Sequence, residues 1–176
     1  MSKAEWVRTA FDRYEGPLIR YAARITGNVD QARDVVQDTF LKLCAAEQTD
    51  VESHLAAWLY TVCRNRALDV RRKEVRVVSL DTNAASVRES GSPPTAALAE
   101  FHEMHSRVLG VVGTLSQDQQ EVIRLKFQDA LSYKEISQVT GLSVTNVGFL
   151  LHTAIRNIRA RLATQADLRP AQEVEQ

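Results

Sequence analysis

Apolar residues recur every three or four positions along most of the chain, which is the period of a helix with one buried face. The pattern is clearest between Ser116 and Leu162, where it predicts three helices separated by two tight turns. No segment shows the alternation typical of a strand, so we expect an all-α protein. The expected buried positions of the three helices are Val122, Ile123 and Phe127; Tyr133, Ile136 and Val139; and Val147, Leu151, Ala154 and Ile158.

Turn signals mark the ends of these three helices. Ser116 and Ser132 each precede a Gln or Glu by three residues, which is the capping-box pattern of a helix start. Gly141 suits the left-handed residue that ends a helix, and Ser143 is placed to cap the next one. A short helix, a turn at glycine and a longer polar-faced helix are typical of a helix-turn-helix, whose second helix lies in the DNA major groove. The alternative is a plain three-helix bundle.

The N-terminal half shows the same helical period. Gly16-Pro17 interrupts the first run, and because proline is accepted at the first position of a helix, we expect a new helix to begin there and to end at Gly27. A further helix follows this glycine, the polar stretch 47–53 is expected to be a loop, and another helix covers 54–73. The expected buried residues of the first two regions are Val7, Phe11, Tyr14, Leu18, Ala22, Ile25, Ala32, Val35, Val36, Phe40 and Leu43.

A change in composition separates the two halves of the chain. Residues 90–94 read Ser-Gly-Ser-Pro-Pro, which cannot build a core and behaves as a linker, and the helical period resumes after them. We therefore expect two small helical domains, 1–73 and 96–163, joined by a flexible linker at 74–95 and followed by a disordered tail at 164–176.

The net charge is zero, yet charge is unevenly distributed along the chain. Residues 54–73 carry five basic side chains against one acid, and residues 132–163 carry four against one. Residues 28–53 carry six acids against two basic side chains. Two basic patches and one acidic patch suggest two nucleic-acid contacts and a third surface for another partner. The zero overall charge argues against a strong non-specific DNA binder acting alone.

Two helix faces carry candidate binding chemistry. One, in the acidic segment, comprises Asp34, Gln37, Asp38 and Leu41. It is either a solvated face or, because a leucine is exposed among acids, a protein contact. The other, on helix 54–73, comprises Tyr60, Thr61, Arg64, Asn65, Arg71 and Arg72. An aromatic ring among guanidinium and amide groups suits bases that have left their stack, and the alternative is a solvated basic face.

The sequence predicts no metal, cofactor or catalytic site. Cys44 and Cys63 lack metal-ligand spacing and are expected to be buried free thiols in a reducing compartment. His102 and His105 share a helical side, but nothing is placed to complete a metal site. An enzyme is disfavoured because there is neither a nucleophile–base constellation nor a phosphate-binding glycine loop. Without a signal peptide or a run that could span a bilayer, we expect a cytoplasmic protein.

Motifs along the chain resemble those of bacterial extracytoplasmic-function (ECF) sigma factors. The resemblance covers nearly the whole chain except the linker and the tail. Each motif alone is moderately specific, and the set in this order is highly specific. The motifs are Asp34–Leu41, Ala57–Tyr60, Arg64–Arg72, Leu115–Ser116, Leu131–Ile136 and Gly141–Ser143.

This resemblance implies a sigma factor, which binds core RNA polymerase and directs promoter-specific initiation. The first domain would dock on the polymerase clamp through its acidic face. It would melt the minus-ten element through helix 54–73 and the loop 48–53, with Arg71 and Arg72 on phosphates. The second domain would read the minus-thirty-five element, and the linker would thread through polymerase near the nascent RNA path. Whether an anti-sigma factor also binds is left open.

The helix expected to read the minus-thirty-five element departs from the family pattern. Where the family usually has a lysine and an arginine just after Val147, this chain has Gly148 and Leu150. A glycine inside a helix costs about 1 kcal/mol relative to alanine, so Gly148 is expected to serve close packing or close approach of a partner. The groove-facing set is Ser143, Thr145, Asn146, Phe149, His152, Thr153 and Arg156.

Three interpretations of this departure stay open. Asparagine can read adenine and an aromatic edge can meet a thymine methyl, so the upstream element itself could be unusual. Alternatively, the protein relies more on its first domain, or the apolar patch binds a protein.

A regulator whose output domain is a similar helix-turn-helix is the alternative function. Such a regulator commonly carries a sensor domain of strands and helices in front, and no strand pattern precedes residue 116, which counts against it.

Overall fold

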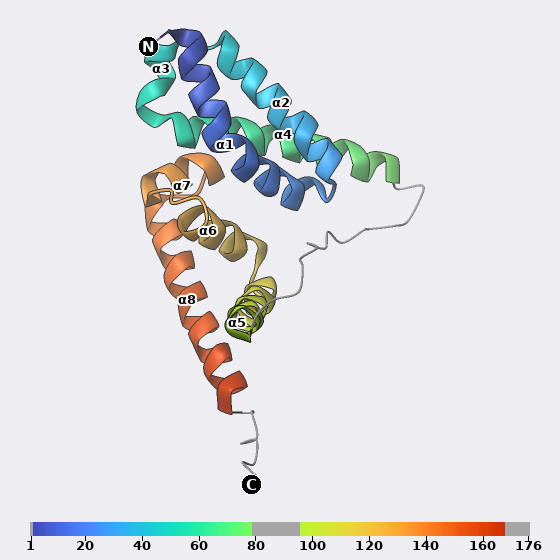
Figure 1. Ribbon diagram of the computed structural model, residues 1–176, viewed down its shortest axis with the longest axis vertical. Coiled ribbons are helices and arrows are strands. Elements are labelled where there is room, and N and C mark those ends of the chain that lie inside the picture. Colours follow the sequence, from blue (N-terminus) through green and yellow to red (C-terminus); the bar gives the residue numbers. More distant parts are fainter. Residues whose placement is uncertain (1, 79–95, 168–176) are drawn as a thin grey trace. The chain divides into compact units, whose positions relative to one another are not determined.

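The computed structural model describes the backbone of residues 2–78 and 96–167 and the side chains of residues 2–74 and 104–164. Every regular element among these residues is a helix (Figure 1), which confirms the predicted all-α fold. Most of the expected linker, residues 79–95, lies outside the described part.

The chain divides into two compact units near residue 90, with Lys134–Gly141 grouped with the first. In the first unit, α1 (Lys3–Thr26) and α2 (Val29–Ala45) form a helical hairpin, and α4 (Leu55–Val78) packs against both (Figure 1). Gly27, at φ 76°, ends α1 as predicted. The core of these helices contains Trp6, Ala10, Leu18, Tyr21, Ala22, Ala32, Val35, Val36, Thr39, Phe40, Leu43, Leu59, Tyr60, Cys63 and Ala67.

The predicted break at Gly16-Pro17 is wrong, because α1 runs through Pro17 without interruption. Proline removes one backbone hydrogen bond inside a helix and usually kinks or ends it. Here Trp6 and Ala10 are buried before the proline, and Leu18 is buried after it. Burial on both sides of the proline favours one continuous helix over two shorter ones.

The predicted loop at 47–53 is also wrong in detail. The chain forms α3 (Gln48–Val51) and the 3-10 turn η1 (Glu52–His54), which lead directly into α4. Val51 is buried within this otherwise polar stretch, and burying it holds the segment in a compact helical turn. At its other end α4 continues past Lys73 to Val78.

In the second unit, α5 (Ala96–Gly113) and α6 (Gln117–Phe127) both pack against α8 (Val144–Asp167). Ser116 and Gln119 form both arms of the predicted capping box at the start of α6. The expected burial of Phe127 is wrong: its side chain is 63% exposed and Leu125 is buried instead. The buried residues of this unit are Val111, Val112, Leu115, Val122, Ile123, Leu125, Leu131, Val147, Leu151 and Ala154.

The short helix, glycine turn and longer helix occur as predicted. Helix α7 (Tyr133–Thr140) ends at Gly141, whose φ is +77°. The Ser143 hydroxyl accepts a hydrogen bond from the backbone N–H of Asn146 at 3.1 Å and so caps α8. Ile136 is buried as expected, but Tyr133 is exposed.

Candidate protein and nucleic-acid interfaces

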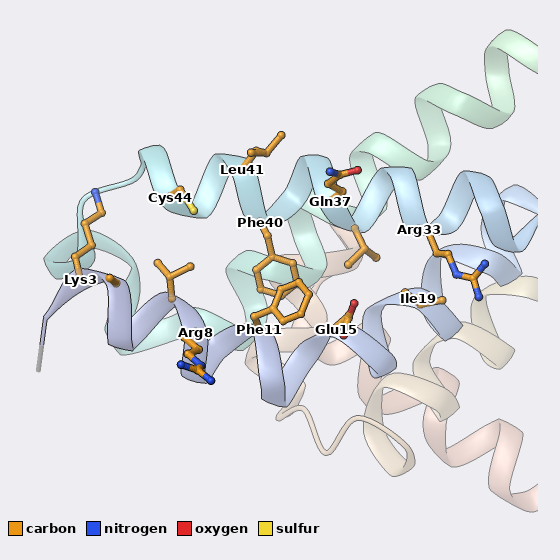
Figure 2. Close-up of a pocket in the computed structure, with 13 residues that line it drawn as sticks. Lys3, Arg8, Phe11, Glu15, Ile19, Arg33, Gln37, Phe40, Leu41 and Cys44 are labelled. Atoms are coloured by element: carbon orange, nitrogen blue, oxygen red, sulfur yellow. The ribbon is translucent and has the colours of Figure 1, made fainter.

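A groove of about 940 Å³ runs between α1 and α2 (Figure 2). Phe11 and Phe40 meet in it with ring centroids 4.9 Å apart, and Leu41 stands on its α2 side. Val7 and Phe11, which the helical period assigned to the core, line this groove, and Trp6 and Ala10 take the core positions instead. Helix α1 therefore has an apolar face wide enough for both the core and the groove.

The acidic face of α2 borders this groove. Gln37 and Leu41 line it, and Leu41 is 61% exposed, in agreement with the expectation that a leucine stands among the acids. Asp34 is exposed on the same face. Asp38 is half-buried, and its Oδ2 accepts a hydrogen bond from Arg66 Nε on α4 at 2.8 Å. Asp38 thus ties α2 to α4, and the rest of the face is presented outward.

The expected nucleic-acid face of α4 needs one correction. Tyr60 is 1% exposed and meets Tyr21 edge-on, with ring centroids 5.2 Å apart, so it is a core residue and offers no surface on which a base could stack. The helical period places Tyr60 at the edge of the buried stripe of α4. At such a position only the packing of α1 determines whether the side chain is buried or exposed.

The remaining residues of this face lie toward the surface of α4. Asn65, Arg71 and Arg72 are exposed, while Thr61 and Arg64 are half-buried. The Thr61 hydroxyl donates to the Ala57 carbonyl at 2.7 Å. Arg72 lies 3.6 Å from Asp69, an exposed pair that contributes little to stability.

The predicted groove-facing residues lie along the exposed side of α8, with Ser143 at its N-cap. Ser143, Thr145, Asn146, Phe149, His152 and Arg156 are exposed, and Thr153 is half-buried. They lie opposite the buried stripe of Val147, Leu151 and Ala154. The structure therefore exposes six of the seven predicted residues and leaves Thr153 half-buried.

Gly148 lies against the ring of Tyr133. A Cβ added to Gly148 would lie 3.6 Å from Tyr133 Cε2, which is an ordinary contact distance. The Lys126 ammonium lies 5.6 Å from the centre of the same ring. Packing within the unit therefore does not require glycine at this position.

The two cysteines have different environments, and the expectation that both are buried is wrong for Cys44. Cys44 is exposed and lines the groove, whereas Cys63 is buried. Burial raises the pKa of the Cys63 thiol to about 12.

Within the described residues no group of three potential ligands could hold a metal ion; His102 is outside the described side chains. Among the helices that the structure describes, none is both long enough and apolar enough to cross a membrane.

Comparison with known proteins covers both units. Residues 10–77 match the family model of sigma-70 region 2, and residues 105–158 match that of sigma-70 region 4. The chain is 30% identical over 165 residues to the ECF RNA polymerase sigma factor SigL of Mycobacterium tuberculosis (strain ATCC 25618 / H37Rv), covering 92% of this chain and 91% of that one.

Two further relatives agree. The ECF RNA polymerase sigma factor EcfG of Rhodopseudomonas palustris (strain TIE-1) is 31% identical over 149 residues, with 83% of this chain and 80% of the relative covered. The RNA polymerase sigma factor YlaC of Bacillus subtilis (strain 168) is 25% identical over 178 residues, with 99% of each chain covered. Because both sigma-70 regions match and the relatives align over most of their length, the chain belongs to the ECF group of sigma-70-family sigma factors.

Proposed function

We infer that this chain binds core RNA polymerase and directs promoter-specific transcription initiation in the cytoplasm. The observation that carries the inference is the presence of sigma-70 regions 2 and 4 in this order over most of the chain. The surfaces described above support it, because each unit presents chemistry suited to one part of that task. An anti-sigma factor is a further proposed partner, which would compete with polymerase for the same chain.

The outward face of α2 and the adjoining groove are the proposed polymerase contact. A groove between two helices suits a helical partner laid along it, with Leu41 as an apolar anchor. Asp34, beside the groove, favours a basic partner surface on the α2 side, whereas Lys3, Arg8 and Arg33 line the groove itself and favour acidic groups there. Asp38 also belongs to the proposed contact, and its bond to Arg66 holds this face against α4.

The exposed face of α4 and the α3–η1 segment (Gln48–His54) are the proposed minus-ten contact. Asn65 offers amide hydrogen bonds to bases, with Thr61 and Arg64 beside it. Arg71 and Arg72 suit phosphates, because their guanidinium groups are exposed farther along the same face. Tyr60 supports this face from the core.

The exposed side of α8 is the proposed minus-thirty-five contact. It comprises Ser143, Thr145, Asn146, Phe149, His152, Thr153 and Arg156. Ser143 already accepts the Asn146 N–H, so its first role is to fix the start of the helix.

Transcription in vitro tests the proposal directly. The purified chain, added to bacterial core RNA polymerase with a library of genomic promoter fragments, should produce transcripts from a defined subset of start sites. Core polymerase alone should produce none of these. If the chain instead bound DNA sequence-specifically without polymerase and left the choice of start sites unchanged, it would be a regulator of the helix-turn-helix type and the proposal would be wrong.

A further inference from the structure

One exposed line of side chains runs along α8. Thr145, Phe149, His152 and Arg156 are spaced four, three and four residues apart, so they lie above one another on one helix face. This face is opposite the buried stripe that contains Leu151. The side chain of Phe149 is 65% exposed in this line, pointing away from the core of its own unit.

The charge of α8 favours a polyanionic partner for this face. From residue 142 to residue 164 there is no acidic side chain. Arg161 donates to the Thr114 hydroxyl of its own unit, whereas Arg156 and Arg159 are exposed on other sides of the helix. These arginines stand in the later turns, where they suit phosphates. The first turns, which carry Thr145 and Phe149, are uncharged. DNA fits this arrangement, because the arginines of the later turns can contact phosphates while the uncharged first turns contact base edges.

The chemistry of the first turns favours A·T pairs. Arg or Lys to guanine is the commonest specific contact in the major groove, and neither residue occurs between positions 142 and 155. Asn146 can pair with adenine through its amide, and an exposed phenyl ring can contact the thymine methyl, an apolar group in the major groove.

We propose that Phe149 is a specificity-determining residue that contacts the 5-methyl group of a thymine, so that the upstream element read by α8 is selected for an A·T pair at this position. The inference rests on the proposed function and adds to it the kind of base pair that the second unit selects. It takes DNA, rather than a protein, as the partner of the apolar surface at Phe149.

The experiment begins with holoenzyme reconstituted from the full chain and bacterial core polymerase. It is used to select promoters from a duplex library randomised in the upstream region. Thymine should be enriched at one or two positions with the wild-type chain, and Phe149→Ala should lose this enrichment while other preferences persist. Phe127→Ala is the matched control, because it removes a phenylalanine of the same unit that is 63% exposed but lies outside α8.

Replacing the selected thymine by deoxyuridine then removes the methyl group without changing base pairing. Wild-type and Phe127→Ala holoenzymes should bind the deoxyuridine promoter about fourfold more weakly, the effect of one apolar carbon returned to water. Phe149→Ala should bind both promoters equally. Equal sensitivity of Phe149→Ala and wild type to the deoxyuridine exchange would overturn the proposal.

Two other outcomes would also overturn it. Selection of promoters without an upstream preference would show that α8 does not read this element. Loss of assembly between Phe149→Ala and core polymerase would show that the ring contacts protein. Transcription from the selected promoters is measured in parallel: if the wild-type chain gave none, the proposed function itself would fail, whereas transcription without methyl dependence would count only against the role of Phe149.

Discussion

Gly148 is a helical glycine whose cost in stability the packing of its own unit does not explain. Glycine within a helix costs about 1 kcal/mol relative to alanine. The space around Gly148 would accept a Cβ at 3.6 Å from Tyr133, so folding of the free chain gives no reason for this cost. The remaining reason is the approach of a partner to α8.

Replacing Gly148 by alanine should therefore stabilise the free chain and weaken its promoter complex. The free energy of unfolding should rise by about 0.5–1 kcal/mol, measured by urea denaturation followed by circular dichroism. Gly110→Ala is the control, because Gly110 is also helical and a Cβ there would meet nothing within 4 Å. It should stabilise the chain without affecting the promoter complex. Destabilisation by Gly148→Ala would mean that Tyr133 cannot accommodate the added methyl.

The two thiols should differ in reactivity, and this difference reports on the groove. The thiolate is the reactive form, and burial raises the pKa of Cys63 to about 12, so Cys63 stays protonated and inaccessible at neutral pH. A thiol reagent should label one cysteine, Cys44, in the native chain and both in urea. Excess core polymerase should slow the labelling of Cys44 if the groove is covered. Unchanged labelling in an assembled holoenzyme would place the polymerase contact elsewhere.

At the scale of elements, α2 and α4 each present one face to the core and another to solvent. The Arg66–Asp38 bond joins the two helices, so charge reversal at Asp38 would disturb packing as well as binding. Asp34 makes no such bond among the described side chains and is exposed, which makes it the better position at which to test the α2 face.

Asp34→Arg should weaken binding to core polymerase roughly tenfold while leaving helicity unchanged, because it places a like charge against a basic partner surface. Asp12→Arg makes the same charge change at an exposed position of α1, away from the acidic face of α2. It should bind as the wild type does. Competition of each variant with labelled wild-type chain for core polymerase measures the difference, and equal affinities would remove Asp34 from the interface.

The face of α4 should separate base contacts from phosphate contacts. Arg71→Ala and Arg72→Ala should weaken holoenzyme binding evenly across promoters and reduce the slope of log affinity against log salt by about one each. Asn65→Ala should change the preferred minus-ten sequence and leave the slope unchanged. Promoter selection and salt titration with each variant supply the two measurements. The same uniform loss in all three would mean that Asn65 does not read bases.

At the scale of the whole molecule, the zero net charge sets what the chain can do alone. DNA affinity rises with the number of phosphates neutralised, and α8 offers few basic side chains in its first turns. Tethering both units to one polymerase raises their effective concentration at the promoter without any new contact. The free chain should therefore bind a promoter duplex at least about a hundredfold more weakly than the holoenzyme does, by fluorescence anisotropy at matched salt. Tight specific binding by the free chain would contradict this.

The sequence by itself determined the helical fold, the glycine turns and the serine caps, because these depend on interactions within a few residues. Gly27, Gly141 and Ser143 act as predicted, since a positive φ or a free backbone N–H is satisfied locally. The order of the motifs also indicated the family, which the relatives confirm.

Some residues lie at the edge of a helix's apolar face, and only the tertiary structure decided whether these are buried or exposed. Tyr60 belongs to the core because Tyr21 covers it, and Phe127 is exposed although the period assigned it inward. Pro17 stays inside α1 because residues on both sides of it are buried. The helical period shows roughly which side chains point toward the core. The neighbouring helices determine how wide the buried face is, and these helices come from distant parts of the chain.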